Sequence, residues 1–361
     1  MASTGNNKLT VKNFFNNILS GTATGIIVGL IPNAVISAIL KLFGQNPITI
    51  QIGHALLMFQ CATPLLIGAL IAIQFKMIPL DVAIVAASAY VGSGITKFIP
   101  QIVNPITKTQ GLFVSAGTGD LINTMITAAI AVGLLLAVGQ HFGSVKIVAA
   151  PILIGGGSSY IGMLILPYVS KLTTWIGDVI NSFTNLQPIL MCILIACMFA
   201  VLIISPISTV AIGMAIQLHG LSAGAAAMGV AATTIVLVVH SWHTNKSGVT
   251  IAIALGAMKM MMPNLFRHPI ILLPTLITAI ISAIPVSLFH VSGTPASAGF
   301  GLVGLVGPLA SLDAGKLSIN IVMAIIVWII IPAVVAVVCQ FVFEKLFKVY
   351  DEKVVFAYLG E

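Results

Sequence analysis

Residues 319–343 read INIVMAIIVWIIIPAVVAVVCQFVF, and this stretch decides the class of fold. It holds no Asp, Glu, Lys or Arg from end to end. A helix needs about 20 consecutive apolar residues to cross the hydrocarbon core of a bilayer. The stretch is longer than that, so it predicts a transmembrane helix.

Similar apolar runs recur along almost the whole chain. Hydrophobic residues fill 59% of the 361 positions and charged residues only 6%, whereas soluble domains carry roughly 25% charged residues. Long runs lie at residues 18–43, 50–75, 121–140, 186–204, 223–239 and 270–289. Shorter or glycine-interrupted runs lie at 79–99, 145–169 and 249–262. We therefore expect an all-α, polytopic integral membrane protein with about ten transmembrane helices.

The charges predict how the chain is oriented in a cell membrane. Lys8 and Lys12 precede the first run, and Lys345, Lys348 and Lys353 follow the last one. Under the positive-inside rule both termini are then cytoplasmic, which requires an even number of spans. The first run is too long for a cleavable signal peptide. The low share of charged residues predicts contact with lipid, and the net charge of +7 reflects a scarcity of acids rather than a basic patch, so no nucleic-acid partner is expected.

The chain shows signs of an internal repeat. Thr63-Pro64 resembles Ser205-Pro206, and residues 123–130 resemble residues 274–281 at a similar spacing. Two halves of five helices each would form an inverted repeat, a common plan of secondary transporters. The alternative is that Gly, Ala, Ile and Thr simply recur in membrane helices.

We interpret the chain as one membrane transport domain with a linker between its halves. Trp175, Ile176 and Val179 lie on an apolar stripe at helical spacing, opposite polar residues that include Thr174 and Asp178. This pattern predicts an amphipathic helix on the membrane surface. The expected boundaries are 1–170 for the first half, 171–185 for the linker helix, 186–344 for the second half and 345–361 for a cytoplasmic tail.

The first candidate site follows Ile204. Pro206 removes a backbone donor and interrupts the helix, which membrane proteins tolerate only where protein or a water-filled cavity surrounds the break. Side chains near the break could bind a polar solute, or the hydroxyls could bond their own backbone. The candidate residues are Ser205, Ser208, Thr209, Gln217 and His219.

The second candidate site is the polar segment His240-Ser-Trp-His-Thr-Asn-Lys-Ser-Gly248. Trp242 offers a face for a sugar ring, and Asn245 offers donors and acceptors, alongside His240 and His243. The alternative is an ordinary loop with Trp242 as an interfacial anchor. His240 and His243 have no third ligand at a suitable spacing, so we expect no metal.

The third candidate site lies within residues 292–304, where Thr294 and Ser297 flank Pro295. Small residues and a helix break predict a re-entrant hairpin, with residues 150–159 as its counterpart in the first half. Close helix packing through small residues is the alternative.

Three further residues are candidates for coupling to protons or ions: Asp120, His54 and Lys246. Asp120 follows a flexible glycine-containing segment and could instead be the N-cap of the next helix. Lys259 is unusual in its apolar run and either reaches an interface or faces a cavity. The four cysteines lie in apolar runs and are expected to pack as small hydrophobic residues. We expect no cofactor and, for want of catalytic motifs, no enzyme.

The segments 205–220, 240–248 and 292–309 resemble the membrane subunits, or IIC components, of the phosphotransferase system. Within that family the chain looks like the stand-alone group that includes perfringolysin-regulator-type membrane proteins. The resemblance covers nearly the whole chain. It implies a homodimeric permease for a small polar solute, usually a sugar. It also implies separate partner proteins, IIB and IIA, of which IIB phosphorylates the solute.

The chain departs from that pattern in one respect. Well-studied sugar IIC proteins hold a Glu and a His near the solute, but the first Glu here is Glu344. No residue is therefore matched to the family's carboxylate. The function predicted is a permease that works by alternating access. The alternatives are a membrane sensor or regulator with a transporter-like fold and a proton-coupled carrier of an organic anion.

Overall fold

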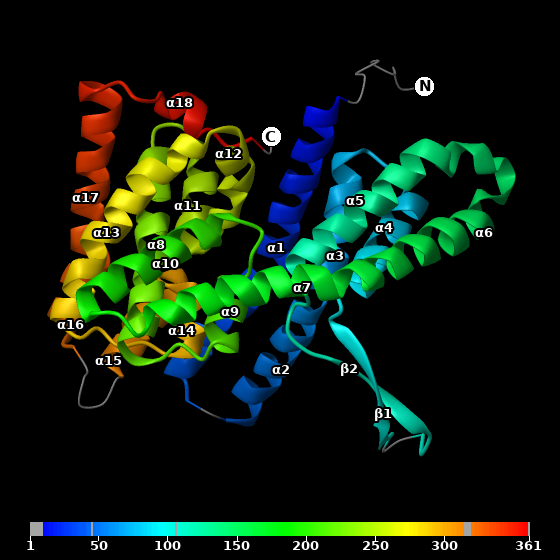
Figure 1. Ribbon diagram of the computed structural model, residues 1–361, viewed down its shortest axis with the longest axis horizontal. Coiled ribbons are helices and arrows are strands. Elements are labelled where there is room, and N and C mark those ends of the chain that lie inside the picture. The colour runs from blue at the N-terminus through cyan, green and yellow to red at the C-terminus, as the bar shows by residue number, and fades with distance from the viewer. Residues whose placement is uncertain (1–9, 45, 105–106, 314–318, 360–361) are drawn as a thin grey trace.

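The computed structural model describes residues 10–44, 46–104, 107–313 and 319–359, and 77% of it is helical. Figure 1 shows α1 standing between two groups of helices. The helices and strands up to the middle of the chain are α1 (Val11–Leu42), α2 (Pro47–Cys61), α3 (Thr63–Gln74), α4 (Pro79–Gly92), β1 (Thr96–Val103), β2 (Gln110–Ser115), α5 (Leu121–Val138), α6 (Lys146–Ala150) and α7 (Gly157–Phe183).

The rest of the chain forms the second group. Its helices are α8 (Pro188–Ile204), α9 (Thr209–Ala215), α10 (Gly220–Ser241), α11 (Ser247–Leu255), α12 (Met262–Arg267), α13 (Leu272–Leu288), α14 (Pro295–Phe300), α15 (Val306–Leu312), α16 (Ile321–Ile325), α17 (Ile331–Gln340) and α18 (Glu352–Val355). A 3-10 turn, η3 (Met258–Met261), lies between α11 and α12.

Several helices have the length and composition of membrane spans, as the apolar runs predict. Among the described residues five stretches qualify: Leu121–Val138, His141–Phe183, Gly220–Ser241, Pro269–Leu288 and Ile321–Leu346. The helices α2 and α3, bent by 47° where Thr63-Pro64 begins α3, would together make a sixth. Shorter apolar helices include α4 and α8. The protein is therefore an integral membrane protein.

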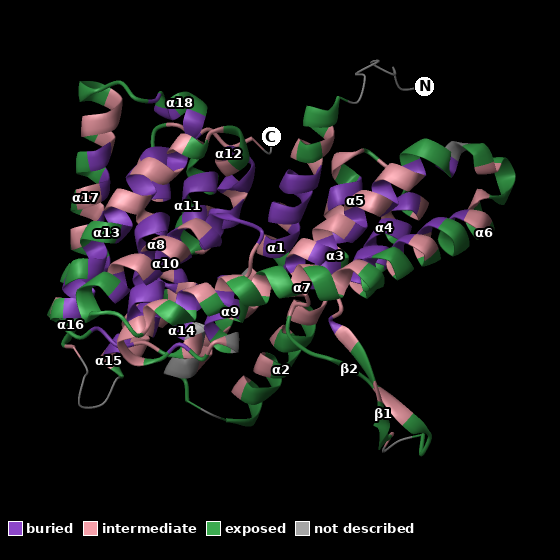
Figure 2. Cartoon of the chain, in the orientation of Figure 1, coloured by how far each residue is buried: buried purple, intermediate pink, exposed green. Residues whose placement is uncertain are grey.

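Two separate hydrophobic cores form, one on each side of the molecule. The first draws its buried residues from positions between Ile18 and Ile154, and the larger second core draws them from positions between Ile180 and Phe356. Helix α10 lies inside the second core, and most of its side chains are buried (Figure 2). Leu19 and Ala23 of α1 pack with Met262, so α1 joins the two sides.

One element of the fold was not predicted. The glycine-interrupted run 79–99 was counted among the expected transmembrane segments, but α4 ends at Gly92 and the chain continues as a β-hairpin that projects from the helices (Figure 1). Its strands pair antiparallel, with Lys97 opposite Val114 and Phe98 opposite Phe113. Aromatic and β-branched residues suit strands. The fold is mostly helical, but the expectation of a purely helical chain was wrong.

Two other expectations about helices were also wrong. Residues 171–183 are helical, as the apolar stripe predicts, but they do not form a separate linker helix, because they continue α7 without a break past Pro167. The expected hairpin at 150–159 is instead a π-helical turn, η2 (Pro151–Gly156), that leads into α7. Figure 1 shows α7 crossing from the side of α6 to the side of α9.

Candidate functional site

The helix break expected at Pro206 is present. Helix α8 ends at Ile204, and α9 begins only at Thr209. The Ser205 hydroxyl donates to the carbonyl of Leu202 at 2.7 Å, and the Ser208 hydroxyl caps α9 by accepting from the amide of Ala211 at 3.2 Å. The short non-helical segment Ser205–Ser208 is therefore stabilised partly by its own hydroxyls, as the alternative interpretation held.

The first turn of α5 faces this break across a cavity. Asp120 is its N-cap, and one carboxylate oxygen accepts from the amide of Asn123 at 2.9 Å. The other oxygen accepts from the Thr173 hydroxyl at 3.5 Å. Asp120 thus has the capping role that was one of its two interpretations, and its second oxygen is turned toward α7.

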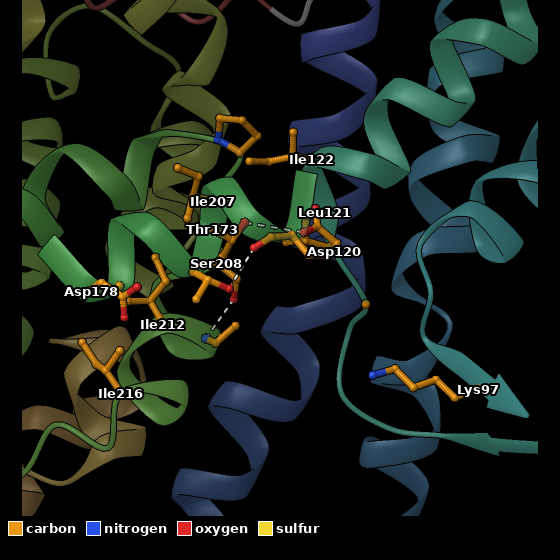
Figure 3. Close-up of a pocket in the computed structure, with 16 residues that line it drawn as sticks. Lys97, Asp120, Leu121, Ile122, Thr173, Asp178, Ile207, Ser208, Ile212 and Ile216 are labelled. Atoms are coloured by element: carbon orange, nitrogen blue, oxygen red, sulfur yellow. Dashed lines mark hydrogen bonds between the residues drawn. The ribbon is translucent and has the colours of Figure 1, made fainter. Parts of the chain in front are cut away.

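A cavity of about 560 Å³ lies between these elements. Figure 3 shows Asp120, Thr173 and Ser208 grouped on it, with Lys97 set apart on the side of the hairpin. Its polar lining residues are Lys97, Asp120, Ser170, Thr173, Thr174, Asp178 and Ser208. Apolar side chains from Leu121, Ile122, Ile207 and Ile212 complete the walls. The cavity therefore has walls from both sides of the molecule.

A second cavity of about 380 Å³ adjoins the first on the side of the hairpin. Both are lined by Lys97, Gly119, Asp120 and Ser170, and the second also reaches Ile99 and Val114 of the two strands. The β-hairpin therefore borders the approach to Asp120.

A third, small cavity of about 50 Å³ lies on the other face of the break. Ser208 lines both this cavity and the large one. Thr209 and Lys259 also line the small cavity, together with apolar residues of α1. The broken segment therefore forms a thin wall between two cavities.

The third candidate segment packs against the break but does not line the large cavity. Thr294 and Ser297 form a capping box at the start of α14, with the Ser297 amide donating to the Thr294 hydroxyl at 3.1 Å. The Thr209 hydroxyl donates to the carbonyl of Gly299 at 2.9 Å. A Cβ at Gly299 would lie 2.4 Å from the Cα of Val210, so α9 and α14 touch backbone to backbone. The small residues serve close packing here.

The second candidate segment is bound by residues near the carboxyl end of the chain. The imidazole of His240 is buried and hydrogen-bonded to the Tyr350 hydroxyl at 2.8 Å. Burial raises the pKa of the Tyr350 phenol above its usual value, which keeps it protonated. Thr244 donates to Glu352 at 2.9 Å, and Asn245 donates to the carbonyl of Phe356 at 2.8 Å. The polar groups of this segment therefore stabilise the fold.

The remaining candidates lie away from the large cavity. Trp242, His243 and Lys246 are exposed in the loop after α10. Gln217 and His219 are exposed in the turn between α9 and α10, where Gln217 has a positive φ of 51°. His54 lines a separate cavity of about 420 Å³ beside α2. Among the described residues, no group of three or more His, Cys, Asp or Glu is arranged to hold a metal ion.

Of the residues predicted for a site, the structure thus brings only Asp120 and Ser208 together on the large cavity. The cavity residues that sequence reasoning missed as site residues are Lys97, Ser170, Thr173, Thr174 and Asp178. The polar stripe of residues 171–185 did signal Thr174 and Asp178, but it was assigned to the membrane surface. That stripe lines the cavity because α7 crosses in front of the break.

Comparison with known proteins agrees with the membrane fold. Residues 16–356 match the sequence model of the family described as phosphotransferase system, EIIC. A search of curated proteins gave no significant match. Neither did a search of solved structures. EIIC proteins are the transport components of their system. Because the match covers nearly the whole chain, this protein belongs to the EIIC family of the phosphotransferase system.

Proposed function

We propose that this protein is a permease that binds a small polyhydroxylated solute, such as a sugar, in the large cavity and moves it across the membrane by alternating access. The observation that carries the proposal is the cavity of about 560 Å³ between Asp120 and the broken helix at Ser208. Cavities for small molecules commonly measure about 300–1,000 Å³. A mono- or disaccharide fits that size.

The lining of the cavity favours a solute with hydroxyl groups. The carboxylates of Asp120 and Asp178 accept hydrogen bonds only, while Ser170, Thr173 and Ser208 both donate and accept. Sugar hydroxyls offer both partners. Two carboxylates against the single cation of Lys97 would repel an anionic solute, which argues against a proton-coupled carrier of organic anions.

The arrangement of the walls suggests how access alternates. Asp120 and Thr173 belong to elements on one side of the cavity, and the break at Ser208 belongs to the side with the larger core. Because the cavity lies between two separately packed cores, a rigid movement of one against the other would open it toward either face. The inverted repeat proposed for the two halves, 1–170 and 186–344, fits such a movement.

The orientation and assembly of the protein are part of the same proposal. If α1, α4, α8 and the broken stretch from α11 through η3 to α12 also cross the membrane, the passes number ten, as the sequence predicts. The first turn of α1 and the short helix α18 lie at the same end of the molecule (Figure 1), which supports termini on one side, the cytoplasmic one. Family membership favours a homodimer that delivers its solute to a separate IIB protein.

The test is a thermal-unfolding screen of the purified protein against sugars, polyols, nucleosides, amino acids and organic acids. A ligand at 100 times its Kd should stabilise the folded state by about 2.7 kcal/mol. Ser208→Ala and Thr173→Ala should weaken the response to the best sugar. His243→Ala, at an exposed predicted site away from the cavity, is the matched control and should leave it unchanged.

Uptake by proteoliposomes then separates the permease from a sensor. A permease carries the solute that binds, with or without a IIB protein present. Binding without flux would favour the sensor or regulator, and a response confined to organic acids would overturn the proposed sugar class.

A further inference from the structure

A lysine side chain lies buried at the break between α8 and α9. Lys259 belongs to η3, and only 6% of the residue is exposed. Its Nζ donates to the carbonyl oxygens of Ser205 and Ile207, the second at 2.8 Å. None of the Asp and Glu side chains in the described part of the chain forms an ion pair with it.

The carbonyls that bind this ammonium are those that the break leaves without helical partners. In a continuous helix the carbonyl of Ser205 would accept from the amide of residue 209, and that of Ile207 from the amide of residue 211. Here the amide of Ala211 bonds the hydroxyl of Ser208 instead. Two carbonyls without helical partners, that of Ser205 at the C-cap of α8 and that of Ile207 within the break, attract a cation.

Such a pair of carbonyls is the kind of site at which broken transporter helices bind a free coupling ion. Unwound backbone carbonyls and helix C-terminal ends coordinate Na⁺ in several secondary transporters. In this chain the same position, at the C-terminal end of α8, is filled by a covalently attached ammonium.

We propose that Lys259 is a built-in cation that replaces a free metal ion at this break and holds Ser205–Ser208 in the conformation that presents Ser208 to the large cavity. Lys259 is a positioning residue, because it contacts the small cavity and acts on the large one through the segment between them. Binding at the large cavity then requires no Na⁺.

The inference rests on the proposed function only in naming this segment as part of the solute site. Its test needs no solute. The inference about Lys259 can therefore fail while the proposed function stands, and the proposed function can fail while the inference stands. The readout is hydrogen–deuterium exchange of amides in residues 203–212 of the purified full chain. NaCl is compared with choline chloride at equal ionic strength.

The expected results concern both the native chain and its variants. The native chain should exchange equally in the two salts. Lys259→Met, which keeps an unbranched side chain but removes the amino group, should speed exchange of these amides about tenfold, which corresponds to about 1.4 kcal/mol of local stability. Na⁺ should partly reverse the effect and choline should not. Lys259→Arg should stay near the native rate.

A matched control is Lys146→Met, which removes a half-buried lysine bound to Asp81 at 2.8 Å in the first core. It should leave exchange at 203–212 unchanged. The proposal is overturned if Na⁺ slows exchange in the native chain, if Lys259→Met exchanges like the native chain, or if Arg and Met disturb the break equally. Should Lys259→Met fail to fold, the salt comparison on the native chain and the Arg variant still decide.

Discussion

At the scale of single residues, the polar side chains divide by where their hydrogen bonds are made. Those of His240 and Asn245 are bound away from the large cavity, whereas Asp120 caps a helix with one oxygen and accepts from Thr173 with the other at the cavity wall. A residue with two roles needs substitutions that separate them.

Asp120→Asn should separate charge from capping. Asn is as good an N-cap as Asp, so the free energy of unfolding should change little. A hydrogen bond to a charged acceptor contributes about 1.5–3 kcal/mol, so affinity for the best sugar should fall about tenfold or more. Thermal unfolding without ligand and calorimetric titration with it measure the two effects. Asp120→Ala, as the comparison, should also lose about 1 kcal/mol of stability. Native affinity in Asp120→Asn would contradict a role in binding.

The sequence could identify Asp120 and Ser208 because each stands beside a visible signal, a helix start or a proline. It could not identify Thr174 or Asp178 as site residues. Their helical spacing was clear, but a polar stripe reads the same whether it faces water or a cavity. What decides is the segment across from it, which comes from distant residues 206–212.

At the scale of elements, the contact between α9 and α14 fixes the broken segment against the rest of the second core. Gly299→Ala should disturb it, because the new Cβ would lie 2.4 Å from the Cα of Val210 and the two helices must separate. We expect a loss of about 1–3 kcal/mol, as for overpacked cores, measured by thermal unfolding. Gly248→Ala, in α11 with no atom within 4 Å of the new Cβ, is the control and should be neutral or stabilising. Equal stability of the two variants would argue against the contact.

The segment near the carboxyl end is a second element with a specific anchor. The buried amide of Asn264 donates to the carbonyls of Val355 and Ala357 at 2.8 and 2.7 Å. Asn264→Ala leaves both carbonyls without this partner and should cost about 1–3 kcal/mol. Limited proteolysis should then cleave between residues 347 and 359 more readily, while Lys353→Ala, at an exposed position, should not have this effect. Unchanged cleavage would show that other contacts suffice.

The elements were predictable where one physical requirement dominated. Apolar runs long enough for a bilayer became helices, and Pro206 ended α8 as expected. The hairpin was missed because Gly92 and Gly94, which mark the end of α4, were taken as an interruption within one apolar run that continues to Ile99. The continuity of α7 was missed because a proline usually kinks or ends a helix, whereas Pro167 lies inside this one.

At the scale of the whole molecule, the two cores should behave as separate bodies. Spin labels at Ile147 and Val337, both exposed and on opposite sides, should change their separation when the best sugar is added. Labels at Ile147 and Tyr160, within one side, should keep theirs. Pulsed dipolar spectroscopy on a background without the four native cysteines measures both pairs. If neither distance changes at saturating sugar, the cores move as one and the proposed mechanism fails.

The anchoring of residues 350–358 also has a consequence for how the protein is made. His240, Thr244 and Asn245 are synthesised more than a hundred residues before the groups that bind them. Until residues 350–356 have been synthesised, the polar groups of these three side chains must form their hydrogen bonds with water, lipid headgroups or a chaperone. The second core therefore closes only when nearly all of the chain has emerged, and a premature stop before Tyr350 would leave this buried histidine without its phenol partner.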